Sequence, residues 1–163
     1  ADIVYNMCGY DADTFIAPCY TLANKLENTL KNINIKGIQG LTIQRIPITD
    51  SLFLKVQRKY NFIGKKNKEG QVYLIRNCIF EPIDKDHFSN LKSVLNQVDE
   101  AFKYGKPLIV CTHRANYIGR ISSNNRDKNL KLLKQLLKYI VSKYEDVEFM
   151  SSDELVKLIQ DEK

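Results

Sequence analysis

Apolar and polar positions alternate between two patterns along the chain. In three segments apolar residues recur every three or four positions, which predicts helices at residues 21–33, 87–104 and 125–144. The stripe expected to face the core from the longest of them comprises Leu130, Leu133, Leu137, Ile140 and Tyr144, and Leu132, Leu136 and Val141 widen it. Short runs rich in apolar residues predict strands at residues 14–17, 38–43, 108–112 and 147–150, all of them buried except that at 38–43, whose burial is left open. Because strands and helices alternate, we expect an α/β fold with a mainly parallel sheet, either open or part of a barrel.

The stretch between residues 48 and 83 has a less regular pattern. Two β-like runs, residues 53–60 and 71–80, flank a polar turn. They predict a hairpin or extended loop, or one further barrel strand that ends near Arg76 and Asn77.

Both ends of the chain carry helix signals. Residues 2–9 have the pattern of a helix end, and Gly9 is suited to stop that helix. Near the C-terminus, Ser151 and Glu154 have the spacing of a capping box, which predicts a last helix directly after Ser151.

The composition fits one globular domain spanning residues 1–163. Hydrophobic residues make up 44% of the chain and charged residues 27%, which is sufficient for a core. No apolar run approaches the roughly 20 residues of a membrane-spanning helix, so no membrane partner is expected. The formal net charge of +6 raises the question of nucleic acid. The lysines are dispersed, however, apart from the cluster at residues 65–68, and this favours a solvated surface instead.

The four cysteines, Cys8, Cys19, Cys78 and Cys111, do not form any Cys-x-x-Cys pair. Each has apolar or aromatic neighbours. This pattern predicts small core residues rather than a zinc site or a disulfide framework.

The main candidate for chemistry follows the predicted strand at residues 108–112. A buried run turns polar there, at Thr112, His113 and Arg114. The carboxyl ends of parallel strands are where α/β folds bind ligands, and histidine transfers protons near neutral pH. His113 is therefore the expected catalytic acid or base. The alternative is a histidine that only hydrogen-bonds its own loop.

The second histidine, His87, lies at the polar start of the predicted helix 87–104, where Asp84 or Asp86 is the expected cap. We expect His87 to be an exposed or capping residue. With two histidines and no His-x-x-x-His pair, the chain does not supply a triad for a divalent metal. It also contains neither a Gly-rich phosphate loop nor a Gly-x-Ser-x-Gly elbow.

Polar residues follow the other predicted strands too, and in a parallel sheet such strand ends meet on one face. Their side chains suit sugars, carboxylates or phosphates. The set comprises Tyr20, Arg45, Arg76, Asn77, Ser151 and Asp153. The alternative is that most of them cap helices or fix loops, as Ser151 is expected to do.

Four collinear segments, residues 15–20, 70–78, 107–119 and 146–155, resemble the C-terminal half of a polysaccharide deacetylase-like (carbohydrate esterase) domain. The resemblance covers essentially the whole chain. It implies a partial or distorted (β/α) barrel with mainly parallel strands, of which residues 1–163 form the C-terminal portion. Members of this family remove N- or O-acetyl groups from polysaccharides. They use a metal held by an aspartate and two histidines, an aspartate base, and a late histidine as acid.

The resemblance also implies roles for particular residues. His113 matches the late histidine that protonates the leaving group. Pro18, with Cys19 or Tyr20, matches the motif of the groove wall. The residues expected to line the sugar groove are Pro18, Tyr20, Arg76, Asn77, Arg114, Asn116 and Tyr117.

Other features of the family are missing from the chain. It has no early aspartate pair, no metal-binding His-x-x-x-His and no tryptophan, and Ile16 or Ala17 stands where the groove arginine is expected. We therefore expect a portion of a longer protein, inactive alone and without a cofactor of its own. A divalent metal such as zinc is expected in the full-length protein. The location stays open, with export or cell-surface association as the expectation for that longer protein.

Two functions from different classes follow from these observations. The leading one is a carbohydrate-active hydrolase that removes acetyl groups from a glycan, and the alternative is a non-catalytic glycan-binding module on a degenerate barrel. A polysaccharide or oligosaccharide is the expected partner in both, and nucleic acid ranks last. The open sheet edges of a half-barrel predict self-association, unless the middle hairpin covers them.

Overall fold

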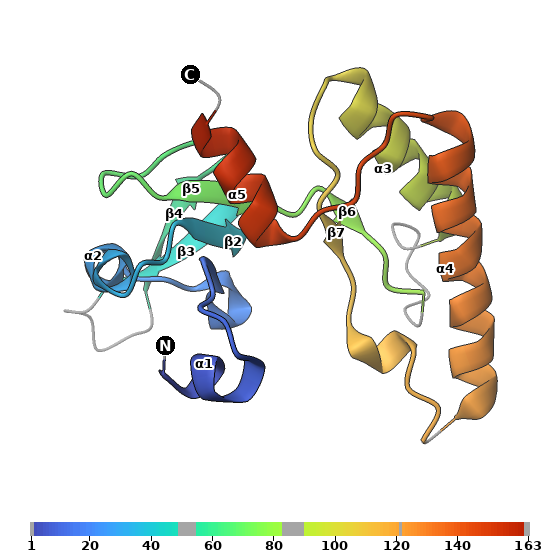
Figure 1. The fold of residues 1–163 in the computed structure, drawn as a ribbon, viewed down its shortest axis with the longest axis horizontal. Coiled ribbons are helices and arrows are strands. Elements are labelled where there is room, and N and C mark those ends of the chain that lie inside the picture. Colours follow the sequence, from blue (N-terminus) through green and yellow to red (C-terminus); the bar gives the residue numbers. More distant parts are fainter. Residues whose placement is uncertain (1, 49–54, 83–89, 121, 162–163) are drawn as a thin grey trace. The chain divides into compact units, whose positions relative to one another are not determined.

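The computed structural model describes residues 2–48, 55–82, 90–120 and 122–161, which form a mixed α/β structure (Figure 1). Its helices are α1 (Asp2–Cys8), η1 (Pro18–Tyr20), α2 (Lys25–Asn32), α3 (Leu91–Lys103), η2 (Arg114–Asn116), α4 (Ser123–Lys143) and α5 (Ser152–Asp161), where η marks a 3₁₀ turn. Its strands are β1 (Thr14–Ile16), β2 (Gly37–Gly40), β3 (Ile43–Pro47), β4 (Val56–Tyr60), β5 (Val72–Ile75), β6 (Cys78–Ile79) and β7 (Val110–Cys111).

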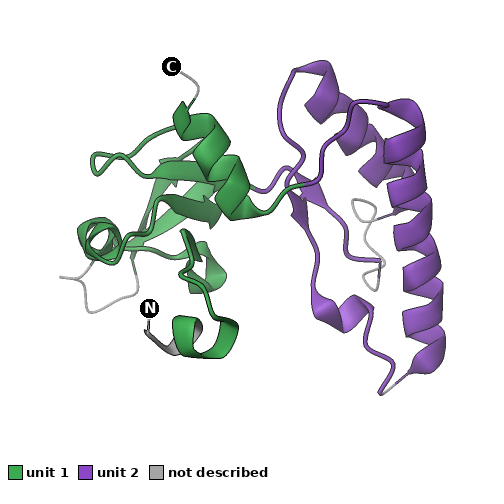
Figure 2. Ribbon diagram, in the orientation of Figure 1, with its two compact units in different colours: residues 1–75, 150–163 green, residues 76–149 purple. Residues whose placement is uncertain are grey.

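The chain divides into two compact units (Figure 2). Unit 1 comprises residues 1–75 and 150–163, and unit 2 comprises residues 76–149. Unit 1 is therefore built from both ends of the sequence, while unit 2 is continuous.

A parallel sheet with the order β1-β2-β5 forms the centre of unit 1. Ile38 and Tyr73 lie side by side in it and belong to a core that includes Leu30 of α2. The opposite face is covered by α5, where a Cβ added to Gly37 would lie 2.5 Å from Cγ2 of Val156. Glycine at position 37 thus allows the helix to approach the sheet closely.

The predicted strand at residues 38–43 is two strands in the structure. β2 joins the parallel sheet, whereas β3 pairs antiparallel with β4. β3 has its own alternation, with Gln44 and Ile46 buried. With this alternation β3 pairs with β4 instead of the parallel sheet, so the predicted single strand is interrupted after Gly40.

Of the three interpretations of the middle segment, the further parallel strand corresponds to β5. All four residues of this strand are buried, as expected for a parallel strand covered on both faces. It ends at Ile75, directly before Arg76.

In unit 2, α3 and α4 lie side by side next to the short parallel pair β6–β7 (Figure 1). Their shared core comprises Cys78, Phe80, Val94, Val98, Leu136 and Ile140. The cap of α3 is Asn90, whose side chain accepts a hydrogen bond from the Ser93 N–H at 2.9 Å. The expected caps Asp84 and Asp86, together with His87, lie outside the described residues.

The core-facing side of α4 agrees with the prediction in part. Ile140 and Leu136 are buried, and Leu133 and Tyr144 pack against the core. Leu130 and Leu137 of the expected stripe are exposed, whereas the polar Asn129 is buried. The helix is rotated because Asn129 faces inward, where its amide donates to the backbone oxygen of Asn116.

The segment at residues 147–150, predicted as a buried strand, is irregular in the structure. Phe149 is 64% exposed, and among the described residues no strand lies alongside to complete the backbone hydrogen bonds. The capping box that follows is confirmed. The Ser151 N–H donates to Glu154 Oε2 at 2.6 Å, and the Glu154 N–H donates to Ser151 Oγ at 3.2 Å.

The prediction that the cysteines are core residues is right for Cys78 and Cys111 and wrong for Cys8 and Cys19. Cys8 ends the surface helix α1, and Cys19 lies in the exposed turn η1. Burial and the neighbouring Cys111 raise the pKa of the Cys78 thiol to about 12, which makes it an inert core group.

Parallel pairing predominates, because β1–β2, β2–β5 and β6–β7 are parallel and β3–β4 is antiparallel. Across the described ranges, these small sheets do not close into a barrel. No helix in the described part of the chain is both long enough and apolar enough to cross a membrane.

Candidate acid–base site on unit 2

The register of β6 against β7 brings two titratable side chains together. Ile79 lies beside Cys111, so Glu81 and His113 follow their strands by the same number of residues. The Phe80 N–H donates to the oxygen of Cys111 at 2.9 Å, which continues the pairing toward both side chains. The polar end of this short sheet therefore carries a carboxylate next to an imidazole.

Nδ1 of His113 lies 2.7 Å from Oε1 of Glu81. The Glu81 side chain is 11% exposed and the His113 side chain 69% exposed, so the carboxylate faces the protein and the imidazole faces solvent. An ionised carboxylate only accepts hydrogen bonds, so the contact with ionised Glu81 is a hydrogen bond only in the tautomer that carries its hydrogen on Nδ1. In that tautomer the other nitrogen, Nε2, is free to accept a proton.

Asn116 holds the other side of this carboxylate. Its Nδ2 donates to Glu81 Oε2 at 2.7 Å and to the backbone oxygen of His113 at 2.9 Å. Asn116 is fully buried, so the sequence-based assignment of this residue to a sugar groove is corrected. A side chain without solvent contact does not line an open groove.

Two hydroxyl groups lie on the exposed side of the site. The oxygens of Thr112 and Tyr117 are 2.9 Å apart. Burial, and less strongly the charge of Glu81, raise the pKa of the Tyr117 hydroxyl, while its hydrogen bond with Thr112 partly offsets this. Tyr117 therefore stays protonated at neutral pH and is able to donate a hydrogen bond.

The remaining groove candidates of unit 2 have different positions. Asn77 donates to the oxygen of Pro107 at 2.9 Å and accepts from the Ile109 N–H at 2.8 Å, so its amide fixes the segment before β7. Arg76 donates to Sγ of Cys111 at 3.3 Å. Arg114 is exposed in η2.

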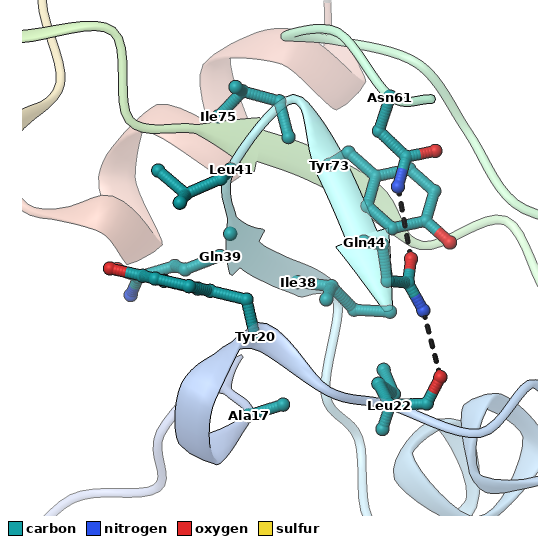
Figure 3. Close-up of a pocket in the computed structure, with 11 residues that line it drawn as sticks. Ala17, Tyr20, Leu22, Ile38, Gln39, Leu41, Gln44, Asn61, Tyr73 and Ile75 are labelled. Carbon is teal, nitrogen blue, oxygen red and sulfur yellow. Dashed lines mark hydrogen bonds between the residues drawn. The ribbon is translucent and has the colours of Figure 1, made fainter. Parts of the chain in front are cut away.

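Pro18 and Tyr20 belong to unit 1, at the carboxyl end of β1. Tyr20 lies next to Gln39 at a small hollow (Figure 3). The volume open to the centre of a water molecule is about 10 Å³, which suits one water rather than a sugar. The structure thus brings together the unit 2 residues His113, Asn116 and Tyr117 and leaves Pro18 and Tyr20 in a separate unit.

Other polar strand-end residues have structural roles, as the alternative interpretation has it. Asp153 accepts from Thr14 Oγ1 at 2.7 Å, which ties α5 to β1. Ser151 caps α5. Arg45 lies in β3 with its side chain exposed.

A second buried polar cluster lies in unit 1. Lys59 Nζ is 3.1 Å from Glu27 Oε1, and the Tyr73 hydroxyl donates to the same oxygen at 2.8 Å. Burial and Glu27 raise the pKa of the Tyr73 hydroxyl. The cluster joins α2, β4 and β5 across the core. Since its groups satisfy one another, we assign it a structural role.

Glu81 is the functional candidate that the sequence analysis missed. A sequence signal for Glu81 exists, because Glu81 directly follows the β-like run at residues 71–80 and His113 directly follows the predicted strand at residues 108–112. To infer from this that the two side chains meet, one must know the register of β6 against β7, which depends on contacts between segments far apart in the sequence.

In the ranges that the structure describes, no three His, Cys, Asp or Glu side chains are close enough to hold a metal ion.

Comparisons of the chain with protein-family models, with curated proteins and with solved structures find no match in any of the three.

Proposed function

We propose that this chain is part of a carbohydrate-active hydrolase that removes acetyl groups from a glycan, with Glu81 and His113 as its proton-transfer pair. The observation that supports the proposal is an exposed imidazole held at Nδ1 by a buried carboxylate. This is the arrangement of a histidine that exchanges protons with a bound substrate. The resemblance of four segments to polysaccharide deacetylases supplies the substrate class.

His113 has a defined part in this reaction. Water adds to the acetyl carbonyl carbon, the C–N or C–O bond breaks, and protonated His113 gives its Nε2 proton to the departing amine or alkoxide. Glu81 stabilises the imidazolium before this transfer, and solvent returns the proton afterwards. The neighbouring Tyr117 hydroxyl is able to donate a hydrogen bond to the substrate.

The proposal extends to the longer protein that the resemblance implies. That protein would be a distorted (β/α) barrel of which this chain is the C-terminal portion. Because the sequence has no His-x-x-x-His pair, the proposal assigns the ligands of its divalent metal, such as zinc, to residues outside these 163. The 163 residues alone should therefore release no acetate from acetylated glycans.

The test is acetate release from acetylated chito-oligosaccharides and xylo-oligosaccharides by the longest protein that contains these residues. His113→Ala should lower the rate about 10²- to 10⁴-fold, the usual contribution of a general acid or base. His87→Ala is the control, because it removes the other histidine. An unchanged rate in His113→Ala would overturn the role of His113. Robust acetate release by the 163 residues alone would overturn the proposal that the metal ligands lie outside them.

The second candidate is a glycan-binding module without catalysis. It is favoured by the exposed polar groups of Thr112 and Arg114 next to the half-buried Tyr117. If oligosaccharides bind to the longer protein while no acetate is released, this alternative replaces the hydrolase.

A further inference from the structure

Asn116 connects the proton-transfer pair to the interior of unit 2. Its exposed fraction is 0%, and its side-chain amide nitrogen donates to groups of the site. It contacts Glu81 and the backbone of His113, and its Nδ2 lies 3.4 Å from Thr112 Oγ1. An amide nitrogen has two hydrogens, and its two short contacts are those to Glu81 and to the His113 oxygen.

The carboxylate of Glu81 is thereby held between two side chains. Oε2 accepts from Asn116 at 2.7 Å, and Oε1 lies 2.7 Å from His113 Nδ1. A buried carboxylate loses hydration, and a charge-assisted hydrogen bond at this distance compensates for the loss. It also prevents the carboxylate from rotating away from the imidazole.

We propose that Asn116 is a positioning residue that fixes the proton of neutral His113 on Nδ1 by holding the Glu81 carboxylate in place against the imidazole. The imidazole then presents Nε2, without a hydrogen, to the solvent side. The inference rests on the proposed function for its catalytic meaning. The proton position itself is a property of the folded chain.

The anchoring of Asn116 on α4 supports this role. Asn129, itself buried, donates to the backbone oxygen of Asn116 at 3.0 Å and to Asn125 Oδ1 at 3.3 Å. Within the described part of the chain, Oδ1 of Asn129 has no hydrogen-bond partner. The amide of Asn129 is thus oriented by its two donated hydrogen bonds, one of which fixes the backbone of Asn116.

Nitrogen NMR of the imidazole rings tests the proposal directly. The chain has two histidines, so His87→Gln assigns the signals of His113. The wild type should show neutral His113 as one tautomer, with its hydrogen on Nδ1. Asn116→Ala should change the ratio of the two tautomers about tenfold, because one charge-assisted hydrogen bond to Glu81 is lost.

Matched variants separate positioning from a general structural effect. Thr112→Val removes the hydroxyl near Asn116 and should leave the tautomer unchanged. Glu81→Gln should abolish the preference for Nδ1, and adding Asn116→Ala to it should cause no further change if Asn116 acts through Glu81. Near-ultraviolet circular dichroism checks folding, and Asn116→Ser, which leaves a smaller cavity, replaces Asn116→Ala if the latter does not fold.

A folded Asn116→Ala or Asn116→Ser variant that keeps a single Nδ1–H tautomer overturns the proposal. A further change in the Glu81→Gln background also contradicts it. Neither result depends on acetate release. If the hydrolase proposal fails while the tautomer responds as expected, the positioning role of Asn116 stands.

Discussion

At the scale of single residues, the contact between Glu81 and His113 decides what unit 2 is able to do. An exposed histidine alone exchanges protons from either ring nitrogen. In our proposal the buried carboxylate, which lies 2.7 Å from Nδ1, restricts His113 to one of them. A surface histidine would thereby become a directed proton donor and acceptor.

A second carboxylate, Asp99, gives a prediction about pH. It accepts hydrogen bonds from Lys143, Tyr144 and Tyr139, at 2.7 to 2.8 Å, which join α3 to the end of α4. The hydrogen bond from Lys143, followed by those from the tyrosines, holds the pKa of Asp99 below its usual range. This contribution to stability is therefore complete above the unfolded-state pKa, about 3.9, and is lost as the pH falls through the lower folded-state pKa.

Asp99→Asn should lower the free energy of unfolding at pH 7 by about 1 kcal/mol, a value reduced because the group is partly exposed. The difference from wild type should shrink below about pH 4, where Asp99 itself becomes protonated. Urea denaturation at several pH values measures this. A difference that is the same at pH 7 and pH 3 would show that the charge of Asp99 is not the cause.

At the scale of elements, the sheet of unit 1 depends on how closely α5 approaches β2. The contact is made at Gly37, which faces Val156 of the helix. Asp153 and Thr14 fix the start of the same helix to β1. The last helix of the chain is thus fitted to the parallel sheet by one glycine and one hydrogen bond.

Gly37→Ala should lower the free energy of unfolding by about 1–3 kcal/mol, because the new methyl group would lie 2.5 Å from Val156 Cγ2. Gly40→Ala, in the same strand, is the control, since a Cβ there meets nothing within 4 Å. Adding Val156→Ala should recover part of the loss. Equal effects of the two glycine substitutions in denaturant titrations would rule out close packing as the reason for Gly37.

The sequence predicted those elements whose signals are local. The capping box of Ser151 and Glu154 depends on a spacing within one turn, and its prediction is confirmed. The inward face of α4 was predicted only in part: Ile140 and Leu136 are buried as expected, but Leu130 and Leu137 are exposed and the polar Asn129 is buried. Glu81 was missed because its proximity to His113 depends on the pairing of β6 with β7, which packing determines.

At the scale of the whole molecule, the sheets leave strands at outer positions. Among the described residues, β1 is the outer strand of the order β1-β2-β5, and β4 is paired on one side by β3. Outer strands present unpaired backbone groups, which other chains are able to pair with. Self-association through such an edge therefore stays a prediction.

Light scattering after size-exclusion chromatography should show a mass above that of one chain, rising with concentration. Ile16→Lys, an exposed position on β1, should reduce the association because lysine at an edge opposes pairing. Ile118→Lys makes the same change at an exposed position outside the strands. A monomer at all concentrations, or equal effects of both variants, would count against pairing through β1.

The division of unit 1 between the two ends of the chain has a consequence for synthesis on the ribosome. Between β5 and α5 the ribosome must make the whole of unit 2, residues 76–149. At roughly 5–20 residues per second this takes on the order of 4–15 s. During that time the nascent parallel sheet lacks the helix that covers Gly37, while unit 2 is able to fold as soon as it emerges. The first unit to begin is therefore the last to be completed, and its uncovered sheet is the surface that chaperones would meet.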